Sequence, residues 1–229
     1  MVGYLMIGGY IMGVAERKER EKERRRKTIL KAAEKVFFSK GVEQATMDEV
    51  AAAAELSKGT IYLYFKNKVD LLHAVISKAL DILYAKFEAA VKIGKTGIDK
   101  IHAIGKAYLD FYREETRYYH LLLHQEQKEE IEIGRDDVEL DPYVKECKEK
   151  GDMIFTLMAG AVKDGIEDGS IRPDLDPMKV AIVLWGHASG MMHIVANKGK
   201  VLEQMFGINS EELIQYSFQL MRTYMEYKK

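Results

Sequence analysis

The chain has 229 residues, of which 47% are hydrophobic, and a formal net charge of −1. A chain of this length and apolar content can bury a core, which excludes a wholly disordered protein. Its single cysteine, Cys147, excludes an internal disulfide and a multi-thiolate zinc site, so we expect a cytoplasmic protein. Only three prolines occur, and Ala, Leu, Met, Glu and Lys recur at helical spacing, which predicts an all-α fold.

Charge is distributed unevenly along the chain. Residues 16–68 contain 14 Lys/Arg against 9 Asp/Glu, whereas residues 69–229 contain 21 against 27. A basic front part on an acidic body indicates a polyanionic partner for the front part alone.

Residues 1–25 form a predicted N-terminal extension, first apolar and then charged, that is either disordered or helical. The uncharged residues 1–15 are too short to span a bilayer, and no basic residue precedes them, so we expect no membrane-spanning segment. A disordered tail and a weak anchor to a membrane or partner are both open for them. The basic run Arg24–Lys27 that follows could reach DNA phosphates or the minor groove.

Residues 26–70 predict a three-helix DNA-binding domain with a helix-turn-helix. A first helix presents one apolar face and ends at Lys40-Gly41, where glycine can adopt a positive φ. This face consists of Ile29, Ala32, Ala33, Val36 and Phe37.

A second helix and a third follow with a short turn between them. Thr46 is the expected N-cap of the second helix, and Glu49 occupies the capping-box position. The turn, residues 55–57, ends on Ser57, which is the expected cap of a helix over residues 58–65. In this third helix Ile61, with Phe65, is expected to anchor the core, while the small and polar residues at its start face DNA bases.

These residues resemble the tetracycline-repressor (TetR) family of transcriptional regulators over about residues 26–75. The matching run is Thr46-x-x-x-Val50-Ala51-x-x-Ala54-x-Leu56-Ser57-Lys58-Gly59-Thr60-Ile61-Tyr62-x-Tyr64-Phe65-x-x-Lys68-x-x-Leu71, preceded by Ile29-Leu30-Lys31-Ala32-Ala33-x-x-Val36-Phe37 and Gly41. One residue departs from the family, because Glu55 stands in the turn where glycine is frequent. If Glu55 adopts a positive φ, the conformation costs about 1 kcal/mol.

The resemblance implies a sequence-specific, ligand-responsive repressor and assigns residues to DNA. Thr46, Ser57 and Tyr64 would hold phosphates, and Lys68 would neutralise one. The residues implied to approach the major groove are Lys58, Gly59, Thr60 and Tyr62. For the two tyrosines, core packing is the alternative.

Residues 71–229 predict a helical domain for effector binding and dimerisation. The expected helices are 71–93, 98–113, 116–132, 142–168, 177–197 and 210–227. Aromatic and soft apolar residues in this part could line a cavity for an apolar or aromatic small molecule, although ordinary core packing is the alternative for each. The candidates are Tyr108, Phe111, Tyr112, Tyr119, His124, Phe155, Met158 and Trp185.

A homodimer is expected from small residues in 185–191 and from the amphipathic last helix. The residues assigned to the dimer face of that helix are Leu213, Ile214, Phe218, Met221 and Met225. Burial within one subunit is the alternative. A dimer would place two recognition helices roughly 34–36 Å apart and would require a near-palindromic operator.

No enzyme motif has the spacing that its chemistry requires. Gly94-Lys95-Thr96 lacks the earlier glycine of a phosphate-binding loop, and Ser189 lacks the glycine of a nucleophile elbow. His120 and His124 share a helical face without a third ligand at helical spacing, so we expect no metal site and no cofactor. Two alternative functions remain, a helical protein that binds DNA without sequence preference and a helical lipid-handling hydrolase.

Overall fold

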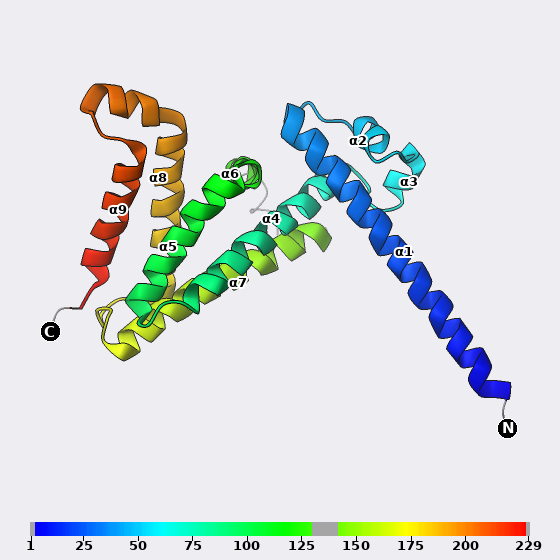
Figure 1. The fold of residues 1–229 in the computed structure, drawn as a ribbon, viewed down its shortest axis with the longest axis horizontal. Coiled ribbons are helices and arrows are strands. Elements are labelled where there is room, and N and C mark those ends of the chain that lie inside the picture. Colours follow the sequence, from blue (N-terminus) through cyan, green and yellow to red (C-terminus); the bar gives the residue numbers. More distant parts are fainter. Residues whose placement is uncertain (1–2, 130–141, 228–229) are drawn as a thin grey trace. The chain divides into compact units, whose positions relative to one another are not determined.

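The computed structural model describes residues 3–129 and 142–227, and within these ranges the regular structure is helical apart from one isolated bridge, Ile171 to Glu226. The predicted all-α fold is confirmed (Figure 1). The helices are α1 (Gly3–Lys40), α2 (Met47–Ala53), α3 (Lys58–Tyr62), α4 (Lys68–Val91), α5 (Gly97–Glu114), α6 (Thr116–Glu129), α7 (Pro142–Asp168), α8 (Pro177–Phe206) and α9 (Ser210–Met225).

The chain forms two compact units, residues 1–76 and 77–229, and the division falls within α4. Unit 1 contains α1, α2, α3 and the start of α4. Its core gathers the apolar faces expected from the sequence, and the central side chains are fully buried. These are Ile29, Ala33, Ile61, Phe65, Leu71 and Val75.

Helix α1 begins far before this core, so residues 3–25 are helical. Its charged segment contains exposed ion pairs between residues one helical turn apart, such as Glu16 with Arg20 and Glu23 with Lys27. Glu21 contacts both Arg24 and Arg25. Exposed pairs of this kind each contribute little, because solvent screens them, but together they support a helix that has little tertiary packing.

Unit 2 is a helical bundle in which α5 packs on α7, α8 and α9. Helices α8 and α9 run side by side in opposite directions (Figure 1). Helices α5 and α7 cross at two glycines, because a Cβ built on Gly97 would lie 2.0 Å from the backbone nitrogen of Gly165. This contact brings the backbones of α5 and α7 together at the point where α5 begins.

Several helix ends differ from the sequence prediction by a few residues, and the end of α8 differs most. Helix α3 ends at Tyr62 instead of residue 65, while α8 continues past 197 to Phe206. The predicted end at 197 was wrong because Gly199 is tolerated inside the helix, where it lies against the hydroxyl of Ser210. The helix stops only at Gly207, whose φ of 69° provides the left-handed cap.

Among the described residues, α8 alone is long and apolar enough to cross a bilayer by length and composition. Of its most apolar 18-residue window, 17% is buried inside the structure. A helix of this length and composition can also pack its apolar face against another helix. Length and composition therefore do not by themselves assign α8 to a membrane.

Candidate nucleic-acid interface

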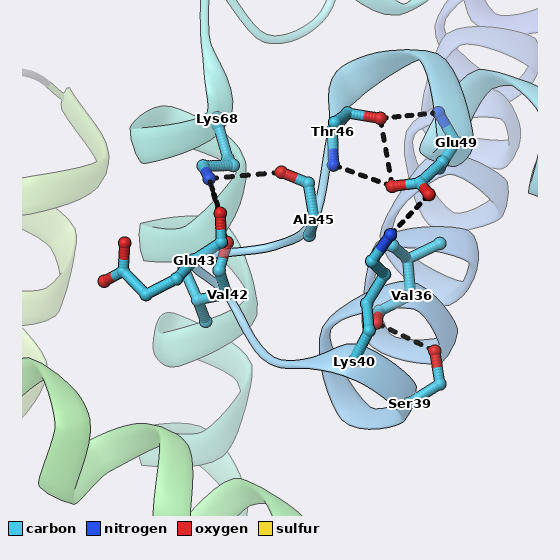
Figure 2. A network of polar contacts seen from close by, with 9 residues as sticks. All are labelled: Val36, Ser39, Lys40, Val42, Glu43, Ala45, Thr46, Glu49 and Lys68. Carbon is cyan, nitrogen blue, oxygen red and sulfur yellow. Dashed lines mark hydrogen bonds and ion pairs between the residues drawn. The ribbon is translucent and has the colours of Figure 1, made fainter.

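Helix α2 starts with the capping box that the sequence predicts. The hydroxyl of Thr46 accepts a hydrogen bond from the backbone nitrogen of Glu49 (3.3 Å), and Thr46 N donates to Glu49 Oε2 (3.0 Å). Lys40, at the end of α1, donates to the other oxygen of this carboxylate (Figure 2). The network fastens the start of α2 to the end of α1 and leaves Thr46 exposed.

This network lowers the pKa of Glu49 below its usual value, first through the hydrogen bond from Lys40 and then through those from Thr46. A group whose pKa is lowered by folding stabilises the fold above its ordinary pKa, and that stabilisation is lost as the pH falls through the lowered value. We therefore expect the difference in unfolding free energy between the wild type and Glu49→Gln to shrink as the pH falls from about 6 to about 3. Denaturant titrations at a series of pH values measure it.

Glu55→Gln is the matched control, because Glu55 is exposed and lies in the same unit. Its difference from the wild type should show a smaller pH dependence. A Glu49→Gln difference that stays constant across the range would contradict the contribution of the capping network.

The turn between α2 and α3 contains the strained residue that the sequence predicts. Glu55 has φ = 55°, and it is the only non-glycine residue with positive φ in the described parts of the chain. The backbone nitrogen of Leu56 donates to the carbonyl of Ala51 (3.0 Å), which closes the turn. Glu55 itself is exposed. The chain therefore makes the tight turn without glycine, at a cost of about 1 kcal/mol.

Helix α3 is short, capped and exposed on one side. Ser57 Oγ accepts from Thr60 N (3.1 Å) and contacts Thr60 Oγ1 (2.8 Å). Below it Ile61 and Phe65 are fully buried, as predicted. The guanidinium of Arg26 lies 6.0 Å from the ring centre of Phe65. Ile61 and Phe65 therefore anchor α3 and the residues after it to the core of unit 1, and the first turn of α3 is exposed.

Several of the residues that the resemblance assigns to DNA are exposed on α3. Ser57, Lys58 and Gly59 are exposed, and Tyr62 is 43% exposed. Lys58 pairs with Asp48 of α2 at 2.6 Å, and the pKa of Lys58 is raised by this hydrogen bond and by the charge of the same carboxylate. A phosphate or base would have to compete with Asp48 for this lysine.

Sequence reasoning missed Asp48 as a partner of Lys58, and it missed Leu63. Leu63 is 84% exposed and directly follows Tyr62 at the end of α3. The sequence did contain a sign of this exposure, because Leu63 does not share the helical face of the two core residues Ile61 and Phe65. We count Leu63 as an apolar group on the DNA-facing surface.

Lys68 has an internal structural contact that the sequence did not reveal. Its ammonium donates three hydrogen bonds into the loop between α1 and α2 (Figure 2). The acceptors are the carbonyl oxygens of Val42 (2.9 Å), Glu43 (3.1 Å) and Ala45 (3.1 Å). Lys68 therefore fixes the loop that places Thr46, besides any contact with a phosphate.

Replacing Lys68 by Met is expected to destabilise the protein by about 1–3 kcal/mol, because three loop carbonyls lose a charged donor. Denaturant unfolding of the full chain measures this, together with hydrogen exchange of the amides that follow the loop. Lys66→Met is the matched control, since Lys66 is an exposed neighbour and the change removes the same charge. Equal stability of the two variants would contradict a role for Lys68 in the loop.

Unit 2 contains an apolar cavity that is partly open to solvent and has about 60 Å³ of room for the centres of water molecules. Helices α5, α8 and α9 contribute most of its lining, with one residue each from α4 and α7. The lining residues are Phe87, Ile98, Ile101, His102, Ile104, Gly105, Tyr108, Met158, Leu184, Trp185, His187, Ala188, Phe218, Met221, Arg222 and Met225.

The predicted effector residues divide between this cavity and the core beside it. Tyr108, Met158 and Trp185 line the cavity. The other described candidates do not line this cavity, and their assignment to an effector stays a prediction. Phe111 and Tyr119 are buried, whereas the half-buried Tyr112 and Phe155 pack on Tyr119 (4.9 Å) and on Trp185 (5.8 Å). The side chain of His124 lies outside the described residues.

The α9 residues of the cavity were assigned to the dimer face by the sequence. Phe218, Met221 and Met225 line the cavity, and Ile214 is 2% exposed. The apolar stripe of α9 therefore faces its own subunit, which is the alternative that the sequence left open. The amphipathic pattern located the stripe correctly but could not show which partner it meets.

Among the described residues no cluster of three or more His, Cys, Asp or Glu side chains is arranged to hold a metal ion. His120 is exposed and packs against Tyr119.

A capped, outward-facing helix held on two supporting helices defines a helix-turn-helix DNA-binding domain. Residues 29–75 match the family model for bacterial regulatory proteins of the tetR family. The uncharacterised HTH-type transcriptional regulator YhgD of Bacillus subtilis is 33% identical over 160 residues, which cover 70% of this chain and 78% of that protein. The fatty acid metabolism regulator protein of the same organism is 26% identical over 158 residues, 69% of this chain and 76% of that protein.

The fold of solved structures agrees. The transcriptional regulator FadR from Bacillus subtilis, solved in complex with stearoyl-CoA, aligns over 87% of this chain and 98% of that chain. The TM-score is 0.64 and the sequence identity is 19%. The chain belongs to the TetR family of transcriptional regulators.

Proposed function

We propose that this protein is a homodimeric repressor that binds a near-palindromic operator and releases it when a small apolar molecule occupies the cavity of unit 2. The observation that carries the DNA-binding part is the first turn of α3, which is capped by Ser57 and exposed while Ile61 and Phe65 are buried beneath it. A helix supported in this way presents its N-terminal residues to base edges in the major groove.

Within this proposal the exposed residues divide between phosphates and bases. Hydroxyl groups at the starts of helices are suited to phosphates, because helix N-termini favour anions. Thr46 and Ser57 stand at such positions, and Tyr64 and Lys68 flank them. The groups that approach base edges are Lys58, Gly59, Thr60 and Tyr62.

A second copy of the chain is the proposed partner of the outer face of α8 and α9. On α8, Ile182 and Ile194 are exposed, and between them a Cβ added to the exposed Gly186 or Gly190 would meet no atom within 4 Å. On α9 the exposed residues Tyr216, Leu220 and Tyr224 repeat at four-residue spacing. Two such helix pairs can form a four-helix interface in which the glycines permit close approach.

This interface also accounts for the apolar character of α8. The helix packs against α7 and α9, and both α8 and α9 carry exposed apolar residues. A face shared by two antiparallel helices fits a protein partner better than a bilayer. We therefore propose a cytoplasmic protein without a membrane segment.

The apolar cavity supports an apolar effector. FadR was solved with stearoyl-CoA, and a fatty acid metabolism regulator is among the relatives, so ligands with long apolar parts occur in proteins of this fold. Phe87 of α4 lines the cavity, and α4 also carries Lys68 of unit 1. An effector that favours one position of α4 would change DNA affinity only if it binds the two states of the protein with different affinity.

Selection of bound sites from random DNA tests the proposal. The expected product is a near-palindromic site that binds at least about a thousandfold more tightly than random DNA at the same salt concentration, the lower limit for specific binding. Sedimentation should show a dimer that Gly190→Arg converts to a monomer. Equal affinity for selected and random DNA would instead favour a helical protein that binds DNA without sequence preference.

A further inference from the structure

His187, one of the residues that line the apolar cavity, carries a buried polar atom without a partner in the described part of the chain. Its Nε2 atom is inaccessible to solvent and has no hydrogen-bond partner among the described residues. The residue belongs to α8 and lines the cavity beside Trp185 and Ala188. Buried polar atoms are nearly always paired, so an unpaired one in a ligand-sized cavity indicates a group that the ligand satisfies.

The other polar side chains of the cavity are engaged or lie at its edge. The hydroxyl of Tyr108 contacts that of Ser189 at 3.1 Å. Arg222 donates to Asp99 at 3.2 Å, and this bond is one of the causes that lower the pKa of Asp99, after the larger effect of the Thr96 hydroxyl. His102 is exposed. Among the described residues that line the cavity, Nε2 of His187 is the buried side-chain atom without a hydrogen-bond partner.

The charge of the lining determines the kind of head group that fits. Arg222 contributes a guanidinium, and none of the lining side chains is a carboxylate. A negatively charged head would therefore meet a ring nitrogen and a guanidinium that is shared with Asp99, without repulsion from a carboxylate of the lining. A positively charged head would find no counter-ion in the lining.

We propose that His187 is the polar anchor of the effector site, and that the effector is an apolar molecule with a single acidic head group bound by Nε2. This inference rests on the proposed function, because it takes the cavity as the effector site. The apolar body of the effector packs against Ile101, Met158 and Phe218, which belong to three different helices.

The protein contains its own reporter for a direct test. Trp185 is the only tryptophan of the chain and lines the cavity, so its fluorescence reports occupancy. The probes are dodecanoate, 1-dodecanol and dodecylamine, which share a chain length and differ in the head group. Dodecanoate is expected to bind the wild type at least tenfold more tightly than either of the others.

His187→Phe should weaken dodecanoate binding at least tenfold and change 1-dodecanol binding less than threefold. His187→Gln keeps an amide that can form the hydrogen bond, so it should retain more dodecanoate affinity than His187→Phe. His193→Phe is the matched control on the same helix, because His193 does not line the cavity and contacts Asn197. It should bind all three probes as the wild type does.

Three outcomes would overturn the anchor. They are equal affinities for dodecanoate and 1-dodecanol, a His187→Phe variant that binds dodecanoate like the wild type, and a Trp185 signal that responds to none of the probes. Operator release is measured separately. Dodecanoate binding that depends on His187 but leaves the operator complex intact would contradict the proposed regulation and leave the anchor standing.

Discussion

A Gly59→Leu variant is expected to lose operator affinity by about a hundredfold while remaining at least as stable as the wild type, since each half-site of a dimer would lose about 1–3 kcal/mol of contacts. A Cβ at Gly59 would meet nothing closer than Ser57 Oγ at 3.9 Å, and the residue is exposed. The fold therefore does not require glycine, which destabilises a helix interior by about 0.5–1 kcal/mol relative to Ala. Under the proposed function, glycine is needed at this position because α3 approaches DNA closely.

Operator titrations and thermal unfolding measure the two effects on the same sample. Gly59→Ala should fall between the wild type and Gly59→Leu in affinity, because its side chain is smaller. The control is Gly160→Leu, at an exposed glycine of α7 with nothing within 4 Å of its Cβ position. Operator affinity that is unchanged in Gly59→Leu would remove α3 from the proposed interface.

Gly97→Ala should have the largest effect on stability, a loss of about 3 kcal/mol or more. The new Cβ would lie 2.0 Å from the nitrogen and 2.2 Å from the Cα of Gly165. Both atoms are backbone of α7, so no flexible side chain can move aside. The two helices must separate, and the apolar contacts of the α5–α7 crossing are lost with them.

Denaturant unfolding measures this loss. Gly160→Ala is the control, because it lies on α7 in open space and should stabilise the protein by about 0.5–1 kcal/mol. Gly97→Ala and Gly160→Ala should therefore change the free energy of unfolding in opposite directions. A loss below about 1 kcal/mol in Gly97→Ala would contradict the close crossing, since overpacking of a tight contact costs at least that much.

Local chemistry made the DNA-binding unit predictable. Thr46 and Ser57 are caps because their hydroxyl groups pair with amides three residues ahead, and such pairs are set by a few neighbouring residues. The positive φ of Glu55 was indicated by the family resemblance, because glycine is frequent at this position of the turn. These features depend on short stretches of chain, and the sequence displays them directly.

Contacts between distant segments were not predictable from pattern. The carbonyl partners of Lys68 lie more than twenty residues earlier in the chain, and nothing in the spacing of the lysine identifies them. The apolar stripe of α9 likewise could have met a second subunit or its own. Only the packing of α5, α8 and α9 shows that Met221 and Met225 line a cavity.

The ion pair between Lys58 and Asp48 gives the DNA-facing surface an internal competitor. Any phosphate that Lys58 meets must first displace a carboxylate, so the lysine contributes less to a loose encounter than its charge alone indicates. A site that also engages Gly59, Thr60 and Tyr62 can offset this exchange, whereas random DNA gains from the charge alone. Under the proposed function, Asp48 is therefore expected to lower background binding more than operator binding, so that an acidic residue on the proposed DNA-binding surface adds selectivity.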